Sequence, residues 1–232
     1  MNPRVWLNVD LGELPGEPEA LYEYAHVASV ACGGHAGDDD SMRRAVDLCA
    51  RRGATLGAHP SYPDREGFGR RPIAMTAGAL LETVTEQCLG LVRIARERGV
   101  QVAYVKAHGA LYHDANASPD AADAVVRGAS EALGPAVTLI GPAAAALAEA
   151  AARAGIAYAR EGFADRGSRA DGTLVPRGEP GALITDPMAA AARAADLASS
   201  GAFDTLCVHG DTPGAVAIAQ AVRRVLDSLA RE

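Results

Sequence analysis

Short apolar segments alternate with longer alanine-rich segments along the whole chain, and this alternation limits the fold more than any other feature. The apolar segments are rich in Val, Ile and Leu, as strands buried in a parallel sheet are. We expect seven strands, at residues 5–9, 27–32, 54–58, 101–106, 136–140, 156–160 and 205–208. Helices are expected at residues 18–25, 41–52, 77–98, 119–133, 143–154, 187–200 and 213–229. This pattern predicts a parallel β/α fold.

Several expected helices carry clear start and stop signals. Ser118-Pro119, Asp186-Pro187 and Thr212-Pro213 each combine an N-cap residue with proline at the first helical position. Glycines that suit a left-handed C-terminal cap follow helical segments at positions 53, 99, 134, 155 and 201. The expected helices are therefore separate elements with defined ends.

Seven successive strand–helix units can close into a barrel or form an open sheet. The GxGxxG motif is missing after the first expected strand, and the chain has no GxxxxGK[ST] loop, so the commonest functions of an open sheet lack their motifs. We therefore expect an α/β fold in the form of an irregular seven-stranded β/α barrel. Because no linker or change of composition interrupts the chain, residues 1–232 are expected to form one domain.

The net charge of the chain argues against nucleic acids and anionic membranes as partners. The 232 residues include 22 basic and 29 acidic side chains, which gives a net charge of −7, whereas nucleic acids and anionic membranes require a basic face. No apolar run approaches the roughly 20 residues of a membrane span, and no signal segment is recognisable. The four cysteines form no CxxC pair and are expected to be reduced thiols of a cytoplasmic protein.

One basic residue stands out against the composition. The chain has 21 arginines but a single lysine, Lys106, and its 51 alanines indicate a general bias toward alanine and arginine. Arginine readily replaces lysine on a surface, but a site that needs a compact ammonium group cannot accept a guanidinium. Since Lys106 lies at the end of an expected strand, we expect it to belong to a functional site.

Histidines gather at the C-terminal ends of the expected strands, where parallel β/α folds build their sites. Five of the six lie just past a strand end, and only His26 lies elsewhere; the five are His35, His59, His108, His113 and His209. Acidic residues follow the same ends, namely Asp10, Glu13, Asp165 and Asp211. Four histidines on separate strands are expected to converge on one face and to form a site there.

Two loops are long enough to carry function. Residues 59–75 include Arg70, and residues 161–185 include Arg166 and Arg177. Arginines in such loops can bind a substrate carboxylate or phosphate through two hydrogen bonds, although a subunit interface would use them equally well. Within the second loop we expect a hairpin between residues 173–175 and 182–185.

The segments at the strand ends resemble those of one protein family. They read NVDLGE (8–13), ACGGHAGD (31–38), GAHPSYPDREGFGRR (57–71), YVKAHGALY (104–112), FADR (163–166), DGTLVPR (171–177) and CVHGDTP (207–213). In this order, and from end to end of the chain, they are similar to the LamB/YcsF proteins, which are A subunits of bacterial 5-oxoprolinase. The resemblance implies a distorted seven-stranded β/α barrel of the glycoside hydrolase/deacetylase superfamily.

The resemblance also implies an activity, which is the ATP-driven opening of 5-oxoproline to glutamate together with separate B and C subunits. An unstrained lactam is a poor electrophile, so ATP is needed to activate its amide oxygen. Ring opening then needs a base for water, a positive group at the oxyanion and an acid for the leaving nitrogen. Because this chain has no P-loop, the B and C subunits are candidates for the phosphorylation.

Site residues follow from the matching segments. We expect Asp10 or His59 to act as base and His108 or His209 as acid, with His35 and Asp211 in the same catalytic group. Lys106 is expected to stabilise the oxyanion or a phosphate. Substrate binding is assigned to Glu13, Arg70, Asp165 and Arg166, with one of the arginines on the substrate carboxylate.

A few positions depart from the family pattern. Gly34 stands where Phe is usual, Ala107 where Pro is usual and His113 where Asn is usual. Smaller differences are Ser29, Gly162 and the Gly167-Ser168 pair. The change at Gly34 is expected to remove an aromatic wall beside His35 and bears on the choice of substrate.

Two other functions fit the same residues. The first is a metal-dependent amide or sugar deacetylase, in which Asp10, His35, His59 and His108 would supply the ligands of a divalent metal, although the paired-Asp and HxxxH signatures are missing. The second is a non-catalytic subunit that binds a lactam or acts as a scaffold, which would not need so many titratable residues on one face. A homo-oligomer is compatible with all three functions.

Overall fold

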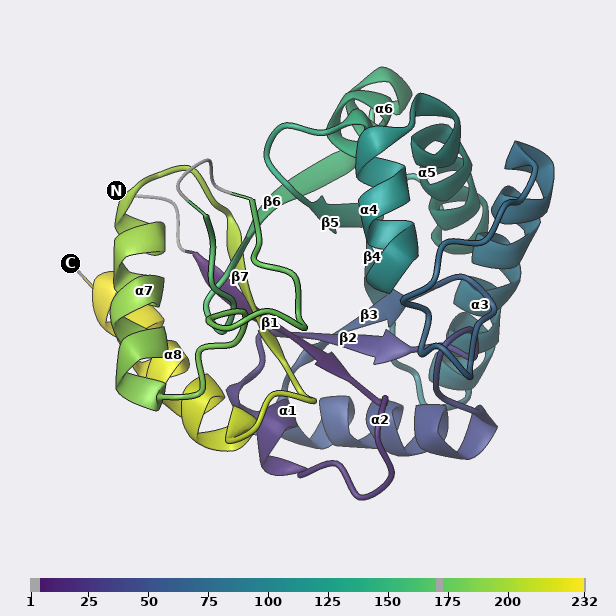
Figure 1. The fold of residues 1–232 in the computed structure, drawn as a ribbon. Helices are drawn as coiled ribbons and strands as arrows, with labels where there is room; N and C mark the ends of the chain where they lie inside the picture. The colour runs from purple at the N-terminus through teal and green to yellow at the C-terminus, as the bar shows by residue number, and fades with distance from the viewer. Residues whose placement is uncertain (1–4, 170–172, 232) are drawn as a thin grey trace.

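Seven parallel strands close into a barrel in the computed structural model, which describes residues 5–169 and 173–231 (Figure 1). The strands are β1 (Trp6–Leu11), β2 (Val27–Ala31), β3 (Thr55–His59), β4 (Val102–Lys106), β5 (Thr138–Gly141), β6 (Ala157–Phe163) and β7 (Thr205–His209). Each strand pairs with the next along the chain, and β7 pairs with β1 to close the ring. The pairing of β3 with β4 shifts register between Leu56 and Gly57, so the barrel is irregular as expected.

The helices surround the barrel (Figure 1). They are α1 (Ala20–Tyr24), α2 (Asp39–Arg52), α3 (Ala77–Glu97), α4 (Gly109–Ala117), α5 (Pro119–Leu133), α6 (Ala146–Ala154), α7 (Pro187–Ser199) and α8 (Ala215–Leu229). Buried aliphatic side chains of the strands, such as Leu7 and Val9, pack in one core with those of the helices, such as Val84 and Ile218. Within the described residues no helix has the length and apolar character that would let it cross a membrane.

The predicted helix starts are correct at two of three positions. Ser118 and Asp186 cap α5 and α7 by accepting hydrogen bonds from the backbone N–H groups of Ala121 and Ala189. The prediction at Thr212-Pro213 is wrong, because α8 begins at Ala215 after Gly214, which has a φ of 80°. The Thr212 hydroxyl donates instead to Asp165, at 2.6 Å, so a tertiary contact replaces the cap.

Five strands run further than expected, by one residue in β3, β5 and β7 and by two or three in β1 and β6, and one helix was not expected at all. Strand β1 continues to Leu11 and β6 to Phe163, which places Asp10 and Glu161 inside strands rather than after them. Helix α4 follows β4 directly, so His113 lies in a helix and not at a strand end. The buried residues of α4 are spaced as in a helix and could have indicated it; they are Ala110, Leu111, Tyr112 and Ala115.

Alternating residues of the strands fill the barrel interior in layers. The N-terminal layer is apolar and includes Trp6, Val27, Tyr104, Ile140 and Ala159. Two residues further along the same strands the side chains are polar, and they include Asn8, Lys106 and Glu161. Asp10, His59 and His209 lie at the C-terminal end of this interior. The barrel therefore has an apolar base beneath a charged upper half.

A buried hydrogen-bond chain joins the first and last strands. The Asn8 amide donates to the Thr205 hydroxyl at 2.9 Å, and this hydroxyl donates to the Trp6 carbonyl at 2.9 Å. The side chains of Asn8 and Thr205 are fully buried, so neither could replace a lost partner with water.

We expect Thr205→Val to lower the free energy of unfolding by about 1–3 kcal/mol, because the near-isosteric change leaves the buried Asn8 amide without its partner and removes one hydrogen bond to the Trp6 carbonyl. Urea denaturation measures the change. Thr55→Val, at the exposed start of β3, is the matched control and should stay within about 0.5 kcal/mol of wild type. Equal stability of the two variants would contradict this account of the barrel closure.

Candidate active site at the C-terminal end of the barrel

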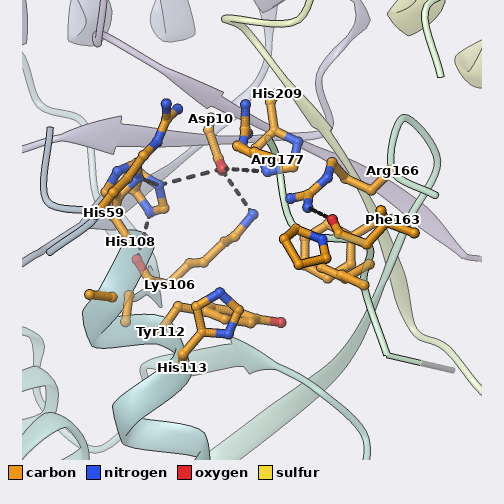
Figure 2. Close-up of a pocket in the computed structure, with 17 residues that line it drawn as sticks. Asp10, His59, Lys106, His108, Tyr112, His113, Phe163, Arg166, Arg177 and His209 are labelled. Atoms are coloured by element: carbon orange, nitrogen blue, oxygen red, sulfur yellow. Dashed lines mark hydrogen bonds and ion pairs between the residues drawn. The ribbon is translucent and has the colours of Figure 1, made fainter. Parts of the chain in front are cut away.

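A pocket of about 350 Å³ opens at the C-terminal end of the barrel (Figure 2). Its lining includes seven of the predicted site residues, namely Asp10, His59, Arg70, Lys106, His108, Arg166 and His209. Tyr112, His113, Phe163 and Arg177 line it as well. Glu13, His35, Asp165 and Asp211 are not in the lining and contact residues that are.

Asp10 lies at the centre of the charged groups. Its carboxylate is 2.9 Å from the Lys106 ammonium, 3.5 Å from His59 Nε2 and 3.9 Å from His209 Nε2 (Figure 2). Burial alone would raise the pKa of Asp10, but the charges of His59 and Lys106 outweigh it and hold the pKa well below its usual value. Asp10 is therefore a carboxylate throughout the neutral pH range.

Lys106 is held inside the barrel by four groups. Its Nζ is 2.8 Å from the Glu161 carboxylate, 2.9 Å from that of Asp10, 3.0 Å from the Asn8 carbonyl oxygen and 3.0 Å from Cys207 Sγ. Burial opposes the charge of Lys106, but Asp10 foremost keeps its pKa well above the usual value. The ammonium group thus neutralises two buried carboxylates and has no N–H left over for solvent.

His59 takes its orientation from the backbone of the neighbouring strand. Its Nδ1–H donates to the Lys106 carbonyl oxygen at 2.7 Å, so Nε2 faces Asp10 and Glu13. Burial would lower the pKa of His59, but the charge of Asp10 and its hydrogen bond raise it above the ordinary value. A protonated ring here is balanced by a carboxylate on either side.

The ring of His108 is oriented in a similar way, by a backbone carbonyl group of the 59–75 loop. Its Nε2–H donates to the Phe68 carbonyl oxygen at 2.9 Å, while Nδ1 lies 3.0 Å from His59 Nε2 and 3.1 Å from Glu13 Oε1. Burial lowers the pKa of His108, and its bond to Glu13 only partly offsets this effect. Both ring nitrogens are engaged by protein groups.

Glu13 and His35 lie behind the pocket wall. Glu13 Oε1 is 3.0 Å from His35 Nε2, and both side chains are buried. Burial would raise the pKa of Glu13, but its hydrogen bonds to His108 and His35 bring it far below the usual value. Burial lowers the pKa of His35 to about 4. The ring of His35 stacks on that of His108, with centroids 3.6 Å apart.

The aromatic ring beside His35 comes from Phe68. Phe68 has a φ of 54°, an uncommon value for a residue with a side chain, and its ring meets those of His35 and His108 edge-on at 5.3 and 5.4 Å. A side chain at Gly34 would instead collide with Gln87 and Ser61. His35 therefore has an aromatic neighbour although position 34 is glycine, and a larger residue at position 34 would require Gln87 and Ser61 to move.

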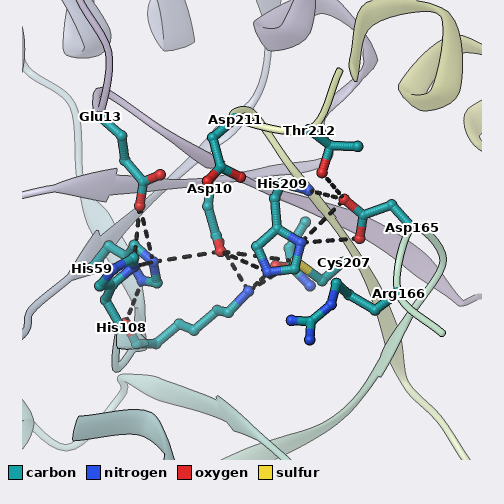
Figure 3. A network of polar contacts seen from close by, with 12 residues as sticks. Asp10, Glu13, His59, His108, Asp165, Arg166, Cys207, His209, Asp211 and Thr212 are labelled. Atoms are coloured by element: carbon teal, nitrogen blue, oxygen red, sulfur yellow. Dashed lines mark hydrogen bonds and ion pairs between the residues drawn. The ribbon is translucent and has the colours of Figure 1, made fainter. Parts of the chain in front are cut away.

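His209 forms a pair with Asp165 (Figure 3). The Asp165 carboxylate accepts from the backbone N–H of His209 at 2.9 Å, from its Nδ1–H at 3.0 Å and from the Thr212 hydroxyl. Asp165 is fully buried, and its bonds to His209 outweigh burial and keep its pKa low. This pairing fixes the proton on Nδ1 of His209 and leaves Nε2 toward the pocket.

Arginines of both long loops meet at the rim of the pocket. Asp211 accepts from Arg70 at 2.6 Å and from Arg177 at 3.1 Å. Arg166 donates to the carbonyl oxygens of Val175 and Ala182 and so ties the second loop together. The arginine cluster is therefore already ordered by protein partners.

The expected hairpin in the second loop is wrong. Leu174 pairs with Ser168, and Leu183 pairs with Arg166, so both segments flank residues 166–168 rather than each other. Asp171 and Gly172 of the DGTLVPR motif lie outside the described residues.

Comparison with known proteins gives the same result as the motifs. The family model described as "LamB/YcsF family" matches residues 5–232. The chain belongs to the LamB/YcsF family. It is similar to the solved lactam utilization protein from Thermus thermophilus, with 33% identity over 98% of this chain and 97% of that one and a TM-score of 0.90. A solved structure described as T48 deacetylase with substrate shares the fold, at 15% identity over 98% of this chain and 85% of that one with a TM-score of 0.51.

Several residues of this LamB/YcsF site were not singled out from the sequence. Asn8, Glu161 and Cys207 contact Lys106 from three other strands. They lie two residues before Asp10, Phe163 and His209, which line the pocket from the same three strands. Because every second side chain of a strand points to the same side, this spacing could have identified them from the sequence. Phe68 gave no such signal, because its role depends on its backbone conformation.

The depressed pKa of His35 predicts a loss of stability in acid. The folded protein keeps His35 neutral down to about pH 4, whereas the unfolded chain takes up a proton near its ordinary pKa of 6.5. Stability is thus highest above pH 6.5 and falls as the pH drops toward 4, by about 3 kcal/mol for this group.

Urea denaturation between pH 7 and pH 4 in the presence of a chelator tests this prediction. His35→Gln should show a shallower fall over that range, although His108 still contributes in the same direction. His113→Gln is the comparison variant: burial lowers the pKa of His113 as well, but this histidine is less buried, so its replacement should make the fall shallower by a smaller amount. An unchanged slope in His35→Gln would show that His35 is not the group concerned.

Proposed function

We propose that this LamB/YcsF protein is the A subunit of an ATP-dependent 5-oxoprolinase, a cyclic amide hydrolase that opens 5-oxo-L-proline to L-glutamate with B and C subunits. Membership of the family supports this, as does the likeness to a protein described as a lactam utilization protein. ATP would be a co-substrate of the complex and yield ADP and phosphate.

The observation that carries the proposal is the composition of the pocket. A buried carboxylate, Asp10, lies between an imidazole on each side, and arginines stand at the rim. A pocket of about 350 Å³ suits a small ring compound rather than a polymer. 5-Oxoproline has one lactam and one carboxylate, which match the acid–base groups at the base of the pocket and the arginines at its mouth.

Among the candidates for proton transfer, the contacts favour His209. Its Nδ1–H is bound to Asp165, so its free Nε2 can take a proton from the attacking water and pass one to the leaving nitrogen. His108 is less suitable because both of its nitrogens are bound to protein groups. His59, whose raised pKa favours the protonated ring, is better placed as an acid or a positive charge than as a base.

Activation of the lactam is assigned to the partner subunits. Phosphorylation of the amide oxygen gives an intermediate that water attacks at the ring carbon. The C–N bond then breaks as the nitrogen takes a proton, which leaves an acyl phosphate, and a second water hydrolyses this acyl phosphate to the carboxylate and free phosphate. Arg177 and Arg70 are suited to hold the substrate carboxylate, since they already bind the carboxylate of Asp211. Arg166 would mainly order the loop that carries Arg177.

Reconstitution tests the proposed function. The purified chain is combined with B and C subunits from the same source, and glutamate release from 5-oxoproline is followed with and without ATP. We expect release only with all three subunits and ATP, and a loss of at least about 100-fold in kcat for Asp10→Asn. Asp47→Asn, which removes a carboxylate from an ion pair on the surface, is the matched control.

Two results would contradict the proposal. One is hydrolysis of an acetylated amide or sugar by the chain alone without ATP, which would favour the deacetylase. The other is full activity of the complex with Asp10→Asn, which would favour a scaffold.

The contacts of Lys106 favour a role in holding Asp10, and they predict different effects for two substitutions. Lys106→Arg keeps a positive charge near the two carboxylates, so we expect the protein to fold. Its larger, planar group does not fit between Asn8, Asp10 and Glu161, so we expect activity to fall at least about 100-fold. Lys106→Met leaves two buried carboxylates without a counter-ion and should destabilise the protein by about 3–5 kcal/mol.

Thermal unfolding and turnover in the reconstituted complex distinguish the two effects. Turnover of Lys106→Arg close to wild type would mean that any cation suffices at this position.

A further inference from the structure

Three imidazole rings and one carboxylate converge beside the pocket. Glu13 Oε1 lies 3.0 Å from His35 Nε2, 3.1 Å from His108 Nδ1 and 3.6 Å from His59 Nε2. His59 Nε2 and His108 Nδ1 are 3.0 Å apart. One atom from each of the four side chains lies within 4.8 Å of the other three, and all four residues are buried.

These spacings are close to those of a metal centre. A tetrahedral zinc ion with bonds of about 2.0–2.2 Å holds its ligand atoms about 3.4 Å apart. Four of the six separations in the cluster, from 3.0 to 3.6 Å, bracket this value, and all six lie within 4.8 Å. The ligand atoms are therefore already close to the spacing of a metal centre.

Two of the rings are oriented as metal ligands usually are. A histidine that binds a metal typically donates its other N–H to a carbonyl or carboxylate, which fixes the tautomer. His59 donates from Nδ1 to the Lys106 carbonyl, and His108 donates from Nε2 to the Phe68 carbonyl. In both rings the remaining nitrogen, which carries the lone pair in the neutral form, faces the cluster.

We propose that Glu13, His35, His59 and His108 bind one divalent transition-metal ion of the zinc class. Three imidazole nitrogens and one carboxylate oxygen suit zinc, and four protein ligands complete its tetrahedral coordination. The site is closed, so the ion fixes His59 and His108 in the pocket wall rather than holding substrate. This proposal does not depend on the proposed function.

The ligand set differs from the one expected from the sequence for a deacetylase. Asp10 was expected among the ligands, but its carboxylate is held by Lys106, and Glu13 takes the place next to the three histidines. His35 and His108 stack with an angle of 4° between their planes, and parallel rings cannot both direct a lone pair at one ion. Binding therefore requires one ring to tilt.

A second group of potential ligands is less suitable. Asp10, Cys207 and His209 also lie close together. The Lys106 ammonium, however, is 2.9 Å from Asp10 and 3.0 Å from Cys207, so a cation there would be repelled at short range. Only this second group contains a thiol, Cys207, so thiolate coordination would show that the ion binds there rather than at Glu13 and the three histidines.

Cobalt and zinc titrations of the full chain test the proposal. The purified protein is stripped with a chelator and titrated with Co²⁺ alone. We expect one Co²⁺ per chain, with the intense visible absorption of a four-coordinate ion and no thiolate charge-transfer band, and displacement of Co²⁺ by Zn²⁺.

Variants locate the ion. Glu13→Gln and His35→Gln should each weaken Zn²⁺ binding by at least about 100-fold, more than the loss of an outer hydrogen-bond partner usually does. His113→Gln is the matched control, because it removes a nearby histidine outside the cluster and should leave Zn²⁺ affinity unchanged. Far-UV circular dichroism checks the fold of each variant.

The proposal is overturned by any of three results. These are no stoichiometric Co²⁺ binding by the folded wild-type chain, a thiolate band that disappears in Cys207→Ser, or unchanged Zn²⁺ affinity in a folded Glu13→Gln. If a variant does not fold, the wild-type cobalt spectrum decides alone.

Discussion

The ion pairs of Lys106 are the interaction on which the rest of the site depends. A barrel interior can hold the carboxylates of Asp10 and Glu161 only if a cation lies between them, since an unpaired buried charge is strongly unfavourable. Lysine meets this need with a compact ammonium group on a long apolar stem. Through Asn8 the same network reaches Thr205 and the closure of the barrel, so the charges of the site and the joining of its first and last strands form one structure.

The site divides into two halves that meet at Asp10. On one side, residues that follow β1 to β4 supply Glu13 and three stacked or edge-on imidazole rings, covered by Phe68. On the other side, β6 and β7 supply the Asp165–His209 pair and the loop that brings Arg177 to Asp211. In the first half, His59 and His108 line the pocket but have their ring nitrogens bound by protein groups, whereas the second half has a ring nitrogen of His209 and guanidinium groups facing the pocket. The first half is thus fixed by protein contacts, and the second half leaves polar groups directed at the pocket.

Much of this architecture could be predicted from the sequence because it depends on local patterns. The period of apolar segments indicated all seven strands, and the polar residues at their ends indicated most of the pocket. The extension of β1 through Asp10 could not be predicted in this way, because a strand is not expected to continue through an acidic residue until the facing Lys106 is known. The same holds for Glu161. Helix α4 and the conformation of Phe68 depend on contacts with other segments, and the cap at Thr212 gave way to a contact with Asp165, 47 residues earlier.

The isolation of Lys106 has a practical consequence for studying this molecule. The chain contains a single ε-amino group, which lies in the pocket lining with 3% of the residue's surface exposed. Its hydrogen bonds to Asn8, Asp10 and Cys207 engage the amine, so an amine-specific reagent can react with it only when this network opens. The rate at which such a reagent modifies Lys106 therefore measures how often the charged interior of the barrel opens.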